Sequence, residues 1–279
     1  ITYGDWSSDV CSSDLDMTIQ GATNWAAHNV DPLEKPMELQ MSDSVFIGSH
    51  ACSCGAWCAG PADLMPKEYA ETFPEQYNCM TTIKGLLTAG CGVGACAHKF
   101  SSGSHVQGRI AGKSAVKYAN DHKDYVPAVS DAQIAKLKEA CFKPMATFEA
   151  NKNFTTQIDV NPNYISPHNY LFRLQKIMGE YAGGWETNYG TTDKLLEIGI
   201  WKLGLLLEDA EKLAAKDSHE LMRAWEAFHR SIVGMACAHT RMARKESRWP
   251  GYYYKYDYLK LDTGKNVFIN VKWDKAKNE

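Results

Sequence analysis

The 279-residue sequence predicts an α/β plus α fold, in which an α/β segment precedes an antiparallel helical domain. Residues 80–118 have the composition of a buried strand, a glycine-rich turn and a helix of small residues. Residues 196–242 contain two stretches in which apolar residues recur every three or four positions, as in amphipathic helices. Two such helices bury their matching stripes most simply against each other.

The first half of the chain is expected to hold short strands and long loops. Residues 16–80 are rich in Gly, Pro, Ser and Cys. Within this stretch, residues 61–73 are expected to form a helical turn or two. Residues 80–90, "MTTIKGLLTAG", have the β-branched and apolar content of a buried strand that ends at a glycine. Residues 104–120 repeat small and apolar residues at helical spacing, which predicts a helix.

Four helices are expected in the second half. The first starts at a Ser or Asp cap in "SDAQIAKLKEACFKPM" and ends before Pro144. The next lies in "SPHNYLFRLQKIMGEYAGG", with proline just inside its start and glycines just past its end. The last begins at Asp217, which forms a capping-box-like pair with Glu220. The stripes predicted for the last two helices are Leu196, Ile200, Leu203, Leu207, Ala210 and Ala214, and Leu221, Trp225, Phe228, Ile232, Met235, His239 and Met242.

The two ends of the chain differ from the rest. The tail, "RWPGYYYKYDYLKLDTGKNVFINVKWD", alternates aromatic and polar residues and predicts a hairpin or edge strands. Residues 4–15 read like a translated sequencing adapter joined to a reading frame. We therefore expect residues 1–15 to take no part in the fold, and the chain to be the C-terminal portion of a longer protein.

Composition narrows the class of protein. A formal net charge of -3 and the lack of a basic stripe argue against a nucleic-acid partner. No apolar run approaches the ~20 residues that span a membrane, so we expect no membrane insertion. The nine cysteines are too dilute for a disulfide scaffold and no secretion signal is present, which predicts cytoplasmic thiols.

Cysteine spacing does not indicate a metal site. Cys52, Cys54 and Cys58 form a C-x-C-x-x-x-C pattern, and Cys91 and Cys96 are five residues apart. Neither pattern matches the cysteine run of a ferredoxin cluster or the paired C-x-x-C of a zinc ribbon. We therefore expect no metal in this chain and interpret these residues as buried free thiols.

Two histidines lie close to the glycine-rich turn. His98 and His105 flank "KFSSGS", between this turn and the expected helix. Chemistry concentrates on loops that a rigid scaffold positions, and histidine changes its charge near neutral pH. His98 is therefore a candidate functional residue, whereas His239 is expected to be a core histidine.

The turn itself, residues 90–94, lacks the G-K-[ST] of a phosphate-binding loop and the G-x-G-x-x-G dinucleotide fingerprint. It can nevertheless present backbone N–H groups at a helix N-terminus, which favours anions and electron-rich oxygens. Gly103, between Ser102 and Ser104, would let a planar ligand lie against the chain. The residues alone leave two interpretations open, a ligand-binding turn and a plain structural turn.

The order of these elements resembles the C-terminal half of succinate dehydrogenase and fumarate reductase flavoproteins. Within that superfamily, residues 16–279 resemble the adenylylsulfate reductase alpha-subunit family. The arginine that donates a proton in dicarboxylate oxidoreductases is absent, and Lys99 is nearest in register. The resemblance rests on "MSDSVFIGSHACSCGAWCAGPADLMPKEY", "AHKFSSGSHVQGRIAGKSAVKY", "NPNYISPHNYLFRLQKIMGEYAGG", "GTTDKLLEIGIWKL" and "RWPGYYYKYDY".

The resemblance implies an FAD-dependent enzyme that reduces adenosine 5'-phosphosulfate (APS) to sulfite and AMP in dissimilatory sulfur metabolism, or catalyses the reverse. It implies an iron–sulfur beta subunit as partner, whose clusters are not in this chain. His98 matches the family's catalytic histidine beside the substrate sulfate. The residues matching segments that bind FAD are Gly90, Cys91, Gly92, Ser102, Gly103, Ser104 and His105.

The resemblance also implies a division of the chain. After residues 1–15 we expect the end of a capping domain and the return to the FAD domain (16–80), the C-terminal part of the FAD-binding domain (81–125), the helical domain (126–250) and a C-terminal extension (251–279).

One residue departs from the family pattern. Relatives usually carry an acidic residue that bonds a cofactor hydroxyl where this chain has Cys91. A thiol is a poor acceptor, so a loosened FAD site is expected there. Two alternatives to the implied function also stay open: another flavoprotein oxidoreductase of the fumarate reductase and succinate dehydrogenase type, or a non-catalytic helical scaffold subunit.

Overall fold

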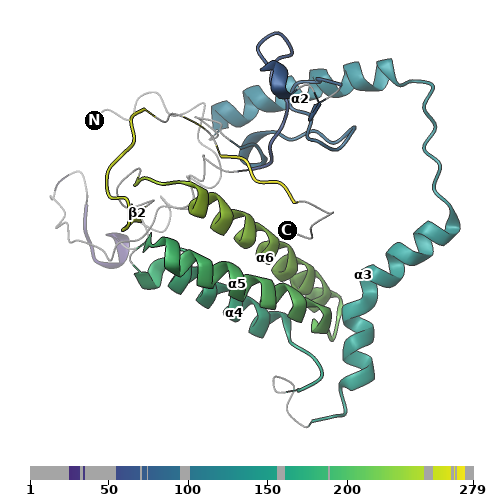
Figure 1. Cartoon of the computed structure of the whole chain (residues 1–279). Coiled ribbons are helices and arrows are strands. Elements are labelled where there is room, and N and C mark those ends of the chain that lie inside the picture. The colour runs from purple at the N-terminus through teal and green to yellow at the C-terminus, as the bar shows by residue number, and fades with distance from the viewer. Residues whose placement is uncertain are drawn as a thin grey trace. The chain divides into compact units, whose positions relative to one another are not determined.

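The computed structural model describes the residues that its coloured ribbon follows in Figure 1. The chain divides into two units, Ile1–Tyr125 and Val126–Glu279, and each is taken by itself below. No helix in the described ranges is long and apolar enough to cross a membrane. The described residues are 25–31, 34, 55–69, 71–73, 75–94, 101–155, 161–187, 189–247, 254–264, 267 and 269–273.

The first unit contains isolated bridges in place of the predicted strand. Residues 80–90 turn back on themselves at Gly85, whose φ is +76°, so that Met80 pairs with Leu87. Cys58 pairs with Thr81 in a second antiparallel bridge. The strand prediction was wrong because a glycine in the left-handed region reverses the chain in the middle of the apolar run.

The helix expected at 104–120 is confirmed as α2 (Ser101–Asp121). Before it lie two 3₁₀ turns, η2 (Lys67–Tyr69) and η3 (Gly90–Gly92). At the far end of α2 the Tyr77 hydroxyl donates to Asp121 over 2.7 Å, and the Tyr77 and Tyr118 rings meet edge to face at 5.2 Å. These contacts attach the loop before the turn to the C-terminal end of α2.

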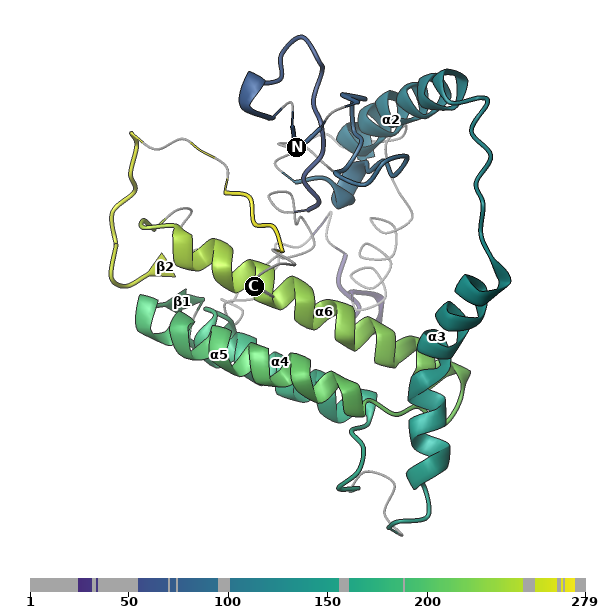
Figure 2. The same ribbon diagram turned by 45° about the vertical axis from the view of Figure 1, so that its right-hand side comes forward.

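The second unit is built on three helices that lie side by side in both views (Figures 1 and 2). They are α4 (Pro167–Tyr181), α5 (Asp193–Asp209) and α6 (Ser218–Ala243). The 3₁₀ turn η4 (Trp185–Thr187) follows α4, and η5 (Ala210–Lys212) follows α5. Their shared core consists largely of Tyr170, Leu174, Leu196, Leu203, Leu206, Ala224, Ala227 and Ala238.

The capping signals of these helices are confirmed. The Ser166 side chain accepts from the N–H of Asn169 at 3.3 Å, and α4 ends before Gly183, whose φ is +74°. Asp217 caps α6 by accepting from the N–H of Glu220 at 2.8 Å. The Glu220 carboxylate accepts from the N–H of Lys216, one residue earlier than a regular capping box requires.

The face of α6 that is buried differs from the predicted stripe. Its buried residues after Leu221 are mainly small, whereas Ile232 is 42% exposed and His239 is exposed. Small side chains let neighbouring helices approach closely, and a Cβ on Gly234 would lie 3.1 Å from the sulfur of Met178. The buried residues of α6 are Leu221, Ala224, Ala227, Ser231, Gly234 and Ala238.

The predicted end of α3 (Asp131–Asn151) was wrong, because the helix continues through Pro144. Its start is as expected, with Ser130 and Gln133 in a complete capping box. Proline removes a helix hydrogen bond and displaces nearby carbonyls. In this chain the Trp225 indole N–H donates to the Cys141 carbonyl over 2.9 Å, and the N–H of Ala215 donates to the Pro144 carbonyl, also over 2.9 Å. Tertiary hydrogen bonds therefore hold the helix on both sides of a proline that a local pattern treats as a helix end.

The described part of the tail forms one short strand, not a hairpin. The strand β2 (Tyr254–Lys255) pairs in parallel with β1 (Gly190–Thr191), which immediately precedes α5. Parallel pairing joins segments distant in sequence, so the alternation within the tail did not reveal it.

A fully buried lysine holds the tail in place. The Lys255 ammonium, 0% exposed, donates to the carbonyls of Arg241, Met242 and Arg244 at 2.9–3.1 Å and forms an ion pair with Asp193. The last carbonyls of a helix have no partner within it, so this ammonium caps α6. Burial lowers the pKa of Lys255, and the Asp193 carboxylate opposes that shift.

The partner carboxylate is strongly stabilised in its charged form. Burial alone would raise the pKa of Asp193, but hydrogen bonds from Lys245 and Lys255 outweigh it and lower the pKa to about 2. The Tyr258 hydroxyl donates to the same carboxylate over 3.1 Å. One carboxylate at the start of α5 therefore binds three side chains from the region that follows α6.

Candidate cofactor-binding turn

The turn at Gly90 lies against the first turns of α2. Gly90 is buried with φ +63°, and a Cβ on it would lie 3.1 Å from the Ser104 hydroxyl oxygen. Both the positive φ and this close approach require glycine. The N–H of Gly90 donates to the Gln107 side-chain oxygen over 2.8 Å, and its carbonyl accepts from the N–H of Val93.

A second backbone segment supports the turn from another side. The N–H of Ala56 donates to the Gly92 carbonyl over 2.7 Å, and the N–H of Gly94 donates to the Ala56 carbonyl over 3.0 Å. A Cβ on Gly55 would lie 2.7 Å from the Gly92 carbonyl oxygen, so only glycine allows this crossing. The turn is therefore held between residues 55–56 and α2 by backbone contacts.

The electrostatics at the start of α2 favour an anion. The first turn of this 21-residue helix contains no acidic residue, so none of its own carboxylates offsets the positive end of the helix dipole there. The arrangement fits an anionic or electron-rich group that approaches backbone N–H groups closely.

The structure brings some of the predicted site residues together. Gly90 lies against Ser104, Gly103 is half-buried near the helix start, and Gly92 and His105 are exposed. The backbones of Cys91 and Ser102 are placed in η3 and α2. His98 lies outside the described residues, as do Lys99 and residues 1–15.

Sequence reasoning missed Gln107. It lies three residues after Ser104, on the helix face that meets the turn, and it makes the side-chain hydrogen bond to Gly90. A polar residue at helical spacing from two small site residues is the signal that could have identified it.

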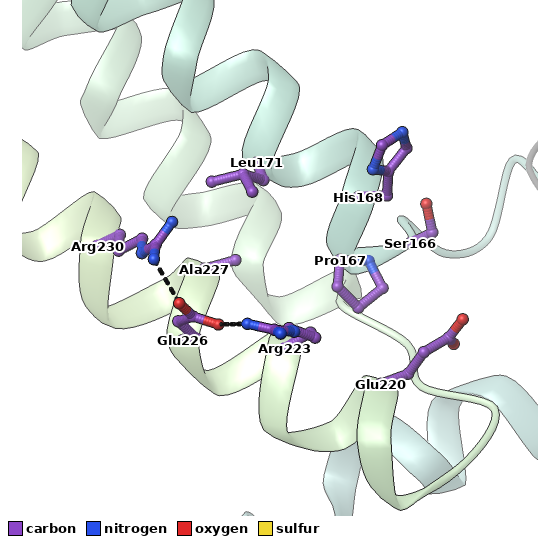
Figure 3. Close-up of a pocket in the computed structure, with 9 residues that line it drawn as sticks. All are labelled: Ser166, Pro167, His168, Leu171, Glu220, Arg223, Glu226, Ala227 and Arg230. Carbon is purple, nitrogen blue, oxygen red and sulfur yellow. Dashed lines mark hydrogen bonds and ion pairs between the residues drawn. The ribbon is translucent and has the colours of Figure 1, made fainter. Parts of the chain in front are cut away.

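The second unit contains a separate hollow of about 310 Å³ between α4 and α6, shown in Figure 3. Glu226 forms ion pairs with Arg223 and Arg230 on its wall. Glu220 also lines the hollow, so its two arginines are balanced by two glutamates and it offers no strong preference for an anionic ligand. None of the predicted site residues lines it. Its lining residues are Ser166, Pro167, His168, Leu171, Glu220, Arg223, Glu226, Ala227 and Arg230.

No group of three or more His, Cys, Asp or Glu side chains suited to a metal ion occurs within the described ranges.

No protein-family profile matches the chain. A curated relative, the adenylylsulfate reductase subunit alpha of Megalodesulfovibrio gigas, is 44% identical over 270 residues, which is 95% of this chain and 40% of the relative. Over almost its whole length, this chain is similar to a part of that alpha subunit.

Solved structures of adenylylsulfate reductases are also similar to this chain. Adenylylsulfate reductase from the hyperthermophilic Archaeoglobus fulgidus superposes with a TM-score of 0.79 at 46% identity, over 95% of this chain and 42% of that one. An adenosine-5-phosphosulfate reductase in complex with sulfite, as a covalent adduct, matches with the same values. The chain thus spans about two fifths of the length of the relatives it matches.

Proposed function

We propose that this chain forms part of the catalytic alpha subunit of an enzyme that reduces APS to sulfite and AMP, or catalyses the reverse. The observation that carries the proposal is 44–46% identity over 95% of the chain to adenylylsulfate reductases, one of them solved with sulfite. FAD is the proposed cofactor, and an iron–sulfur beta subunit is the proposed partner. The proposed location is the cytoplasm.

Within this enzyme we assign FAD to the turn at residues 90–92 and the start of α2. The fit rests on the close backbone approach at Gly90 and on a helix N-terminus without acidic residues. Bound FAD would supply the two-electron redox chemistry. The chain's own groups in this assignment are Gly90, Cys91, Gly92, Ser102, Gly103, Ser104 and His105.

The proposed role of His98 is to stabilise charge on the substrate. The APS sulfate is anionic, and negative charge must be accommodated as AMP departs. A histidine can donate a hydrogen bond or carry positive charge near neutral pH, whereas a lysine such as Lys99 does not ordinarily change its charge in that range.

The function is tested with the full-length protein that contains this chain, purified with its iron–sulfur partner. APS and a reduced viologen dye are expected to yield sulfite and AMP in equal amounts, and fumarate is expected to give no dye oxidation. Fumarate reduction without sulfite release would overturn the proposal in favour of a dicarboxylate oxidoreductase.

Gln107→Leu is expected to weaken FAD retention in that protein about 10-fold, because one hydrogen bond of about 1.4 kcal/mol positions the turn at Gly90. Flavin fluorescence during dilution measures this loss, and circular dichroism should stay unchanged. Asn120→Leu, an exposed amide on the same helix, is the matched control and should retain FAD. Equal retention in the two variants would show that Gln107 does not position the site.

A further inference from the structure

A β-bulge places a cysteine in an unusual backbone conformation. The N–H of Ala59 donates to the Met80 carbonyl, and the N–H of Cys79 donates to the Ala59 carbonyl, each over 2.8 Å. Two residues of one segment therefore face one residue of the other, and the first of them, Cys79, has φ +67°. That position of a bulge is normally glycine, because a Cβ there is strained. Bulges of this kind redirect a side chain.

The redirected side chain meets a second thiol. Cys58 lies in the opposing segment, where it pairs with Thr81, two residues after Cys79. Its thiol interacts with the thiol of Cys79, and the structure holds both as free thiols. Cys79 is 6% exposed, whereas Cys58 is partly exposed. Cys79 also lies 3.6 Å from the Asn78 side-chain oxygen, to which its thiol donates when protonated.

The contact makes the two thiols chemically unequal. The contact with the Cys58 thiol lowers the pKa of Cys79, although burial opposes this shift. The same contact and burial raise the pKa of Cys58. Cys79 is thus the thiol of the pair that ionises first, as a reactive cysteine beside a protonated resolving partner requires.

The pair lies beside the proposed cofactor turn. The Cys79 carbonyl accepts from the N–H of Thr88, two residues before Gly90, over 2.9 Å. The segment that carries Cys58 bonds directly to the turn through Ala56 and the Gly92 carbonyl. A covalent change at these thiols therefore acts on backbone that supports the turn.

We propose that Cys58 and Cys79 are a redox-active dithiol that a peroxide converts to a disulfide. The Cys79 thiolate attacks one oxygen of hydrogen peroxide, the O–O bond breaks, and Cys79 becomes a sulfenic acid while the departing hydroxide takes a proton to form water. The Cys58 sulfur then attacks the Cys79 sulfur, its proton leaves with the sulfenic hydroxyl as a second water, and the S–S bond forms. The dithiol loses two electrons and the peroxide gains them.

Peptide mapping of the full chain tests this proposal. The reduced protein is treated with a small excess of hydrogen peroxide, remaining thiols are alkylated with iodoacetamide, and trypsin cleaves after Lys67, which separates the two cysteines. A disulfide between the peptides that end at Lys67 and Lys84 is expected in most chains, and dithiothreitol should reverse it. Fragment ions between Cys54 and Cys58 assign the bonded sulfur without any substitution.

Two variants complete the test. In Cys58→Ser, the disulfide of Cys79 should disappear and dimedone should trap its sulfenic acid. Cys141→Ser, which removes an exposed thiol, should leave the disulfide unchanged. The proposal is overturned if Cys79 stays fully alkylatable while Cys141 is oxidised, or if Cys79 pairs with another cysteine in the unsubstituted chain.

Discussion

His98→Ala, in the full-length protein with its iron–sulfur partner, is expected to lower APS turnover by about 100- to 1000-fold while FAD stays bound. A preorganised donor beside developing negative charge contributes this much to catalysis. The loss should fall mainly on kcat, since the donor is needed most as AMP leaves. Steady-state sulfite release measures turnover, and the flavin absorbance of the purified variant measures bound FAD.

His105→Ala is the matched control for this prediction. His105 lies in α2, seven residues after His98, and is exposed in the structure. We expect it to lose much less activity than His98→Ala. Near-normal turnover in His98→Ala, or release of FAD from it, would show that His98 is structural and that the proposed role in catalysis is wrong.

Local signals predicted the helices well. Ser166 and Pro167 start α4 and Gly183 ends it, and Asp217 starts α6, because a cap is made by residues within four positions of the helix end. The packing of α5 with α6 was also predictable. Two amphipathic helices joined by a short connection bury their apolar faces most simply against each other.

Features that depend on distant residues were not predictable. Pro144 remains inside α3 with support from Trp225, 81 positions later in the sequence. The buried face of α6 is set by the close approach at Gly234, which hydrophobicity alone does not reveal. The parallel pairing of β1 with β2 joins residues 190–191 to 254–255.

The candidate site likewise contains contacts that were predictable from the sequence and contacts that were not. The contact of Gly90 with Ser104 was predictable because a turn followed by a helix brings the two together within 15 residues. Gln107 was missed because its contribution to the turn is a single hydrogen bond from the N–H of Gly90, 17 residues earlier in the sequence. The contact of Cys58 with Cys79 depends on a bulge, and a sequence does not show which residue is bulged. His98 stays a prediction from resemblance.

Lys255→Met is expected to destabilise the helical unit by about 3 kcal/mol or more, because three carbonyls at the end of α6 lose a charged hydrogen-bond donor and Asp193 loses one of its two cations. The substitution keeps most of the side-chain volume but leaves the Asp193 carboxylate without its buried cation. It also leaves the carbonyls of Arg241, Met242 and Arg244 without the ammonium that caps α6. Urea unfolding followed by far-ultraviolet circular dichroism measures the loss.

Lys245→Met is a control with the same partner. Its ammonium lies 2.7 Å from Asp193, but the side chain is 43% exposed, so the ion pair is worth only about 0.5 kcal/mol. Asp193→Asn combined with Lys255→Met should cost less than the sum of the two single changes, because both remove the same contact. Equal losses of stability in the two lysine variants would contradict the role of Lys255 as a buried cap of α6. A large loss for Lys255→Met alone would mean that the single ammonium of Lys255 joins β2 to the end of α6 and the start of α5.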